Sequence, residues 1–486
     1  MNPPPSTGAV AAADSSGQSA SCRRGGKFGR LELVTGFHVA SLLVFTAWDI
    51  GGETDFARIV NCVWGSLAVL IMGYACLHRL KRHAPLPSAL RWLWPLLLFN
   101  ALVLASLLNP SFTRSIVGNT VMFVSGGSRP GWPSSARPLL SLAALWQFDA
   151  IFLTCFNLLV AVTRRRLLRI LLFIVTINAL LLAVMGTFQK LASAPGLYFG
   201  RVPSPNEFFF SSFIYHNHWG AFCLLFTAAA LGLVFHYADH AETGGRRHSP
   251  ASLGLVAALF LAGSIPLSAS RACTLLVLAL LAGAFLHWMW RLRCRRRAEG
   301  RPTLTPAMVT LVVFLTALGG IYLLGRPVIE ARISKTRQQI GELRLRGSLG
   351  SREQLYADTW QMAQEKIWFG WGFGSYATVF QMFNRQVSVE GWVPFFAEAH
   401  SDWLQLLAEV GLVGALLLLL LAVVPLAASL RLGPPGVLPA YLLAACALVV
   451  VYALVEFPFA NPAVIEAFWF CFFCSLRYHK LTISAA

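Results

Sequence analysis

The amino-acid sequence predicts an all-α polytopic membrane protein with about twelve transmembrane helices and one large extramembrane loop that itself contains helices. Three observations support this fold class. Hydrophobic residues make up 56% of the 486 residues and charged residues only 12%, which does not suit a soluble surface. Apolar windows of roughly 20 residues, the length that crosses a bilayer as a helix, recur along almost the whole chain. Basic clusters then fall on one side of the expected helix order.

The chain divides into four predicted segments. Residues 1–30 form a tail rich in Pro, Ser, Ala and Gly, which we expect to be a disordered cytoplasmic tail rather than a cleaved signal. Residues 31–325 hold spans one to nine, residues 326–401 form the loop domain, and residues 402–486 hold the last three spans and a short cytoplasmic tail. The expected spans are 33–51, 57–78, 90–108, 141–163, 167–189, 210–236, 251–268, 271–291, 306–325, 402–427, 436–455 and 462–477.

The position of the basic residues predicts the orientation of the helices. Clusters such as "HRLKRH" (78–83), "RRRLLR" (164–169) and "RLRCRRR" (291–297) lie on one side. By the positive-inside rule that side is the cytoplasm, so both termini are cytoplasmic and the loop 326–401 lies on the outer face. The net charge of +18 therefore reflects topology, and we expect no nucleic-acid partner.

Cysteine and histidine spacing gives no reason to expect a metal or a cofactor. The ten cysteines are scattered, and only Cys471 and Cys474 have ligand-like spacing, which on a lipid-embedded helix favours packing. In "HNH", His216 and His218 are two residues apart on a helix and face different sides, so they do not chelate together. We expect neither a metal site nor disulfides.

Two arginines stand on the outer face, against the positive-inside rule. Arg271 in "SASRAC" lies in a short connection between spans, and Arg201 follows "PGLYFG". Each taken alone fits an arginine that extends to the membrane interface. A pair on the same face as the large loop also suits an anion-binding site.

The stretch "EAHSDWLQLLAEVGLVG" (398–414) places polar residues at the start of a span. Asp402 and Gln405 have the spacing of a capping box, with Asp402 as the N-cap. Asp402, Gln405 and Glu409 form a polar stripe that we expect to face protein or a water-filled cavity. Capping and packing alone would explain Asp402. His400 lies where the loop returns to the membrane, in a position to exchange protons with a substrate, and Glu398 is close enough in sequence to orient it.

These residues carry a resemblance to a known family. "AHSDWLQLLAEVGLVG" (399–414) resembles the signature of the O-antigen ligase and O-antigen polymerase family. Four further pieces resemble family segments and occur in the family's order: "GTFQ" (186–189), "SSFIYHNHWGAF" (211–222), "SASRAC" (268–273) and "SREQLYADTWQMAQEKIWFGWGFGSY" (351–376). The resemblance covers residues 180–420. Many members have an arginine just before the Asn-His stretch, where this chain has "NEFFFSSFIYHNH", and Arg201 is the nearest candidate.

The resemblance implies a metal-independent, inverting glycosyltransferase of the bacterial inner membrane. Its donor would be a glycan on undecaprenyl diphosphate, and its acceptor a hydroxyl of lipid A core or of another glycan, at the periplasmic face. The implied residue roles are a general base at His400 assisted by Glu398, diphosphate binding by Arg271, Arg201 and Arg352, and a donor cavity lined by Gln189, Asn217 and His218.

Three alternatives stay open at the level of sequence. A polymerase of O-antigen or exopolysaccharide repeat units would use the same donor. A transporter would also suit twelve spans, although no repeated halves are visible. Arg352 could equally form a structural ion pair, and the sequence suggests no role for Glu456 or Asp149.

Overall fold

The computed structural model describes residues 28–118, 120–243, 250–305, 351–387 and 393–484, with scattered positions from 307 to 330. The predicted tail up to residue 27, part of the ninth expected span and most of 326–350 lie outside the described residues. The described elements are α1 (Arg30–Trp48), η1 (Ile50–Gly52), α2 (Asp55–Leu80), η2 (Ser88–Leu93), α3 (Trp94–Leu107), β1 (Phe112–Val117), β2 (Thr120–Ser125), α4 (Pro138–Ala161), α5 (Arg165–Leu191), α6 (Leu197–Gly200), β3 (Val202–Pro203), α7 (His216–Thr243), α8 (Ala251–Leu267), α9 (Arg271–Ala298), α11 (Ser351–Glu365), α12 (Tyr376–Val379), η3 (Phe380–Met382), α13 (Asp402–Leu430), α14 (Val437–Tyr452), η4 (Pro458–Ala460) and α15 (Pro462–Ile483).

The helices confirm the predicted all-α polytopic class. Among the described residues, eight helical segments are long and apolar enough to cross a membrane: α1, α2, η2 with α3, α4, α5, α7, α9 and α13. The apolar helices α8 and α14 are shorter and coincide with two further predicted spans. The last predicted span coincides with α15, which carries Glu466, Arg477 and Lys480 among its apolar residues.

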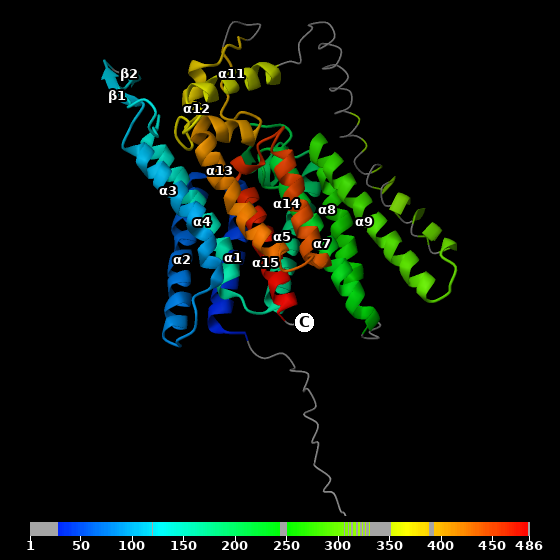
Figure 1. The fold of residues 1–486 in the computed structure, drawn as a ribbon. Coiled ribbons are helices and arrows are strands. Elements are labelled where there is room, and N and C mark those ends of the chain that lie inside the picture. Colours follow the sequence, from blue (N-terminus) through cyan, green and yellow to red (C-terminus); the bar gives the residue numbers. More distant parts are fainter. Residues whose placement is uncertain are drawn as a thin grey trace, which may run out of the picture.

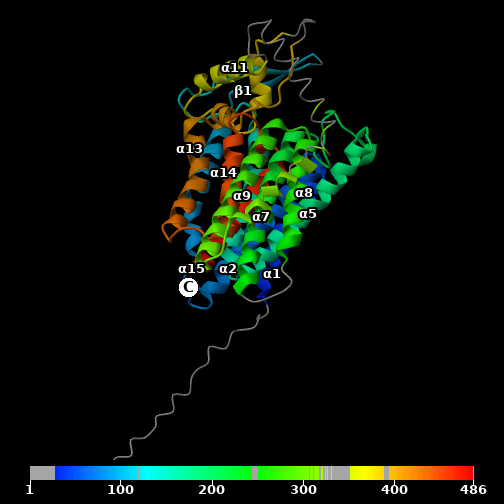
Figure 2. The same cartoon turned by 90° about the vertical axis from the view of Figure 1, so that its right-hand side faces the viewer.

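The helices run side by side as a bundle, with α7 at its centre (Figures 1 and 2). Helix α7 packs against α8, α14, α5, α9 and α15. Aromatic rings fill the space between α4 and α15: the Phe152 ring lies 4.8 Å from that of Trp469 and 5.4 Å from that of Phe473. Burial of such rings gives the interior its close packing.

The extramembrane elements lie at one end of the bundle. Figure 1 shows α11, α12 and the antiparallel β1–β2 hairpin at the end opposite the C-terminus. Helix α11 is the helical stretch predicted within the loop, and it has a small core of its own with α12 that includes Leu355, Met362, Tyr376 and Phe380. This core attaches the loop to the start of α13.

Helix α13 is interrupted at Gly411, whose φ of 64° and ψ of −173° are not helical. The backbone groups freed by this break pair with the glycine-rich segment 367–372. Carbonyls of Ala408 and Glu409 accept from the amides of Trp371 (3.0 Å) and Gly372 (2.8 Å), and the amides of Leu412 and Val413 donate to carbonyls of 367 and 368. A broken helix at membrane depth is stable only when its backbone groups are satisfied in this way.

Candidate functional site

His400 is the residue just before the N-cap of α13. The start of α13 lies at the end of the bundle that carries α11 (Figure 1). Its φ is 53°, in the left-handed region that residues other than glycine seldom adopt. The Tyr356 hydroxyl, from α11, donates to the His400 carbonyl at 2.9 Å. The Phe457 ring meets the imidazole edge to face at 4.7 Å. An unusual backbone conformation is thus maintained from two sides.

The carboxylate that faces the His400 imidazole belongs to Glu456. Its Oε2 lies 3.6 Å from His400 Nδ1 and accepts a hydrogen bond from the Tyr215 hydroxyl at 3.2 Å. Its Oε1 accepts from Arg352 at 2.6 Å. Burial raises the pKa of Glu456, but the interactions with His400 and Arg352 outweigh burial and leave this pKa below its ordinary value. Glu456 is therefore held as a carboxylate beside the imidazole.

Hydrogen bonds connect this carboxylate to the start of α9. The Tyr215 hydroxyl also accepts from Asn217 Nδ2 at 2.9 Å, and Asn217 Oδ1 accepts from the Ser270 hydroxyl at 2.6 Å. Ser270 is the N-cap of α9, so the exposed Arg271 follows as its first residue. A path of polar side chains thus runs from His400 to Ser270, the residue that precedes Arg271 in the chain.

A second branch runs through His218. Its Nδ1 lies 3.1 Å from Glu53 Oε1, which also accepts from Asn461 Nδ2 at 2.8 Å. Burial raises the pKa of Glu53, whereas the hydrogen bonds from His218 and Asn461 lower it, and the net result is a lowered pKa. The Phe457 ring packs against His218 at 5.2 Å and stacks on Tyr215 at 5.0 Å, and the Tyr215 and His218 rings meet at 5.1 Å, so the two branches are in direct contact.

Two predictions about the start of α13 need correction. The N-cap is Ser401, whose hydroxyl accepts from the Leu404 amide at 3.4 Å, and not Asp402. The Asp402 carboxylate instead accepts from the Phe459 amide at 2.8 Å, which ties α13 to η4. Gln405 does reach back, but to the Ala399 amide at 3.0 Å.

Glu398 is the second correction, because Glu456 occupies the place beside His400 in which Glu398 was expected. The Glu398 carboxyl interacts with Gln405 instead, and burial raises its pKa to about 7. The residue nearest in sequence is therefore not the acid nearest to the imidazole.

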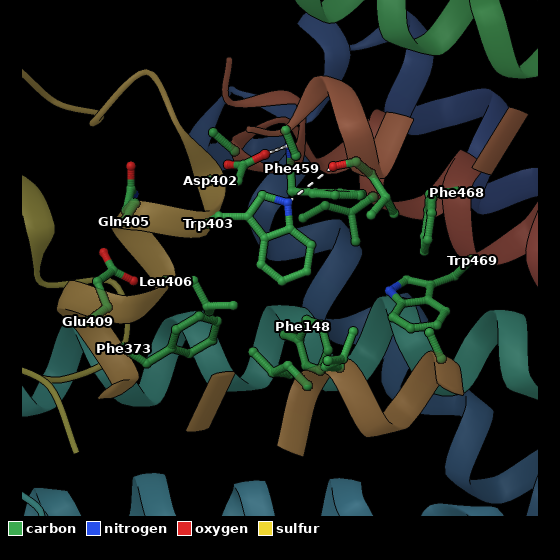
Figure 3. A pocket seen from close by; sticks show the side chains of 17 residues that line it. Phe148, Phe373, Asp402, Trp403, Gln405, Leu406, Glu409, Phe459, Phe468 and Trp469 are labelled. Carbon is green, nitrogen blue, oxygen red and sulfur yellow. Dashed lines mark hydrogen bonds between the residues drawn. The ribbon is translucent and has the colours of Figure 1, made fainter. Parts of the chain in front are cut away.

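The predicted polar stripe lines a pocket of about 250 Å³ between α13, α14, α15 and α4. Figure 3 shows Asp402, Gln405 and Glu409 on one side of it, and aromatic side chains such as Phe148 and Trp469 line other parts of the pocket. The Glu409 carboxylate accepts from the amides of Gly374 (2.8 Å) and Tyr376 (3.0 Å). The stripe thus faces protein and a cavity, as the sequence predicts.

Three remaining residues lie apart from the His400 cluster. Arg201 is exposed and ends the short α6 turn. Gln189 is buried within α5, and its side-chain amide makes no hydrogen bond to the described residues. Asp149 accepts from Asn100 at 3.1 Å and links α4 to α3. Of the predicted site residues, the structure therefore brings together His400, Arg352, Asn217 and His218, with Arg271 adjoining.

Sequence reasoning missed Tyr215, Glu53 and Phe457, and suggested no role for Glu456. An acid in the short connection "EFPFANP" was a usable signal, because polar groups at a membrane boundary need partners in the protein or in water. Nothing in the local sequence ties Tyr215 or Glu53 to His400.

Residues 256–419 match the family described as O-antigen ligase, a segment that contains Arg271, Arg352 and His400. The resemblance drawn from the motifs is thereby confirmed for this part of the chain. The family implies a glycosyltransferase of the O-antigen ligase type, with a lipid-linked glycan as substrate in a membrane environment. No curated protein matches the chain.

Proposed function

We propose that the protein transfers a glycan from undecaprenyl diphosphate to an acceptor hydroxyl of lipid A core, with inversion, at the periplasmic face of the bacterial inner membrane. One observation carries the proposal. His400 lies within the segment that matches O-antigen ligases and has a buried carboxylate 3.6 Å from its Nδ1. A histidine with a carboxylate behind it is a general arrangement for a base that acts through its other nitrogen.

His400 Nε2 accepts the proton of the acceptor hydroxyl in the proposed reaction. The hydroxyl oxygen forms a bond to the anomeric carbon, and the bond between that carbon and the diphosphate oxygen breaks. Undecaprenyl diphosphate leaves with the electron pair. The Glu456 carboxylate stabilises the imidazolium that forms, and general base catalysis of this kind contributes about 10²- to 10⁴-fold.

Arginines would neutralise the leaving diphosphate. Arg271 is exposed at the first residue of α9, and Arg352 keeps 48% of its side chain exposed while it binds Glu456. Guanidinium groups match phosphate oxygens in geometry and stay charged at a membrane surface. Arg201 is a third candidate on the same predicted face. In this scheme the arginines perform the work of a divalent cation, so the reaction needs none.

The pocket beneath the start of α13 suits an apolar part of the donor. Its lining is aromatic and aliphatic apart from Asp402, Gln405 and Glu409, and Asp402 is two residues from His400. Part of an isoprenoid chain in this pocket would place the attached diphosphate near His400 and Arg271.

The test is transfer of glycan from purified undecaprenyl-diphosphate-linked donor, with EDTA present, by wild type, His400→Ala and Arg271→Ala. We expect wild-type activity in EDTA, loss of kcat in His400→Ala, and a raised KM for donor in Arg271→Ala. Arg296→Ala, at the opposite end of α9, is the matched control and keeps activity. Full activity of His400→Ala would rule out the base.

The same assay separates ligase from polymerase when it offers two acceptors. A ligase transfers glycan to lipid A core, whereas a polymerase extends a second lipid-linked repeat unit. Product on the second acceptor alone would replace the ligase assignment with that of a polymerase and leave the donor chemistry unchanged.

A further inference from the structure

A small pocket lies at the end of the bundle opposite α11, where η2 and the last turns of α13 and α15 meet. Its volume of about 90 Å³ is well above the roughly 10–15 Å³ that one water molecule needs. Three cationic side chains line it, those of Arg91, Arg477 and Lys480, and none of the other described lining residues is acidic. Its charge therefore suits an anion.

Arg477 gives this pocket a buried cationic side chain that is fixed in place. The residue is 9% exposed, and its Nε donates to the Val162 carbonyl at 2.5 Å, which fixes the guanidinium in place. That bond is its one side-chain hydrogen bond to a described residue, and Glu32 attracts the guanidinium without a direct ion pair, so the group in contact with this buried charge is a neutral carbonyl. Burial of a cation costs free energy unless an anion accompanies it.

The other cations increase this cost. Lys480 Nζ donates to the Ser88 hydroxyl at 2.9 Å, again a neutral partner. Arg477, Arg91 and Arg79 all repel Lys480, and Arg79 also repels Arg477. Like charges that are brought together in the folded protein destabilise it, and a bound anion would reverse the sign of the effect.

We propose that this pocket binds the phosphate of an anionic phospholipid, such as phosphatidylglycerol, in the leaflet opposite the glycosyl-transfer site. The position favours a lipid over a free ion, because the pocket lies at a helix-bundle end and Trp92, Leu159, Leu432 and Leu476 also line it. Apolar side chains beside three cations suit a headgroup phosphate with the first carbons of its acyl chains. Basic pockets between helices at a cytoplasmic surface recognise anionic headgroups in this way.

The experiment measures lipid binding to the full chain in detergent by native mass spectrometry. The protein is titrated separately with phosphatidylglycerol, phosphatidylcholine and inorganic phosphate. We expect one phosphatidylglycerol to bind to the wild type, and its affinity to be about 25-fold weaker in Arg91→Gln/Lys480→Gln if each charge contributes about fivefold. Arg91 is exposed, so Arg91→Gln alone should fold and bind about fivefold more weakly.

The control variant is Arg293→Gln/Arg296→Gln, which removes two charges from the end of α9 outside the pocket. It should bind phosphatidylglycerol as the wild type does. Unchanged binding in the pocket variants, or an equal loss in the control, would overturn the site. Inorganic phosphate binding as tightly as phosphatidylglycerol would assign the pocket to a soluble anion and overturn the lipid. Glycan transfer is not measured, so the result is independent of the proposed activity.

Discussion

Glu456 connects more of the candidate site than any other described acid. Its two oxygens meet Arg352, Tyr215 and His400, which come from α11, the residue before α7 and the residue before the α13 cap. A buried carboxylate costs free energy unless it is paired, and each partner here reduces that cost. The residue therefore positions His400 and at the same time holds three parts of the chain together.

Replacement of Glu456 by Gln should lower kcat by about 10- to 100-fold, the usual loss when the group behind a functional residue is removed. The shape of the side chain is kept, but the imidazolium that forms in the reaction loses its counter-charge, so the pH–rate profile of the variant should differ from that of the wild type. KM for the donor should change little. The measurement is kcat and KM across pH for purified enzyme.

Asp149→Asn is the matched control for this change, because Asp149 is a partly buried acid hydrogen-bonded to Asn100 and separate from the cluster. It should keep the wild-type pH profile. If Glu456→Gln loses thermal stability but keeps the wild-type profile, its role is structural and the positioning role is wrong.

Glu398 should make stability depend on pH. Burial raises its pKa from 4.5 to about 7. Folding therefore favours the protonated acid, and this contribution is fully present below pH 4.5 and lost as the pH rises to about 7. Glu398→Gln cannot ionise and should not lose this stability, so its Tm relative to that of the wild type should rise between pH 4.5 and about 7. Parallel Tm curves for the two proteins would contradict the raised pKa.

The glycine break in α13 is the element that gives the loop its fixed position. A Cβ at Gly411 would lie 2.3 Å from the Trp368 carbonyl carbon, and one at Gly370 would lie 2.3 Å from that of Glu409. Both glycines also have positive φ. Close backbone approach and unusual dihedrals thus demand glycine at both positions.

Gly411→Ala should lower the free energy of unfolding by about 2–5 kcal/mol, because strain at a left-handed position adds to overpacking. Gly283, inside α9, is the control, since a Cβ added there would meet no described heavy atom within 4 Å. Gly283→Ala should instead stabilise the helix by about 0.5–1 kcal/mol. Thermal unfolding in detergent measures both changes. If Gly411→Ala unfolds at the same temperature as the wild type, the glycine break is not required for stability.

The helix starts and ends were largely predictable, and the exceptions have physical reasons. The sequence indicated a helix beginning after His400, and α13 does begin at Asp402. The cap is one residue earlier because the Asp402 carboxylate bonds to the Phe459 amide, which lies far along the chain. Likewise, the sequence around Gly411 does not predict a break in the helix. The backbone groups next to Gly411 form their hydrogen bonds with residues 367–372, which precede α13 in the chain.

For the whole molecule, the charge rule predicts that α11 and the inner end of α9 lie on opposite sides of the membrane. Cys294, near the end of α9, is exposed, and so is Trp368, which follows α11. A membrane-impermeant thiol reagent applied from the periplasmic side should label Trp368→Cys and leave Cys294 unlabelled until the cells are opened. Labelling of Cys294 in intact cells would reverse the orientation.

Composition and periodicity were sufficient for the membrane class and for a helix that begins directly after His400. They were insufficient to identify the residues that surround His400. Glu53, Tyr215 and Glu456 come from three separate connections, and only the packing of α1, α7 and α14 brings these connections together. Contacts of this kind depend on how the helices pack. The spacing of residues in a single sequence does not determine that packing.

The break in α13 also has a consequence for the order in which the protein is made. The residues that complete it, 367–372, precede α13 in the chain, so their hydrogen bonds to α13 can form only after α13 has been synthesised. The Asp402 amide then still awaits the Ala453 and Glu456 carbonyls, from a connection synthesised later. Any nascent chain released before Glu456 therefore carries the His400 motif without the carboxylate that lies beside its imidazole.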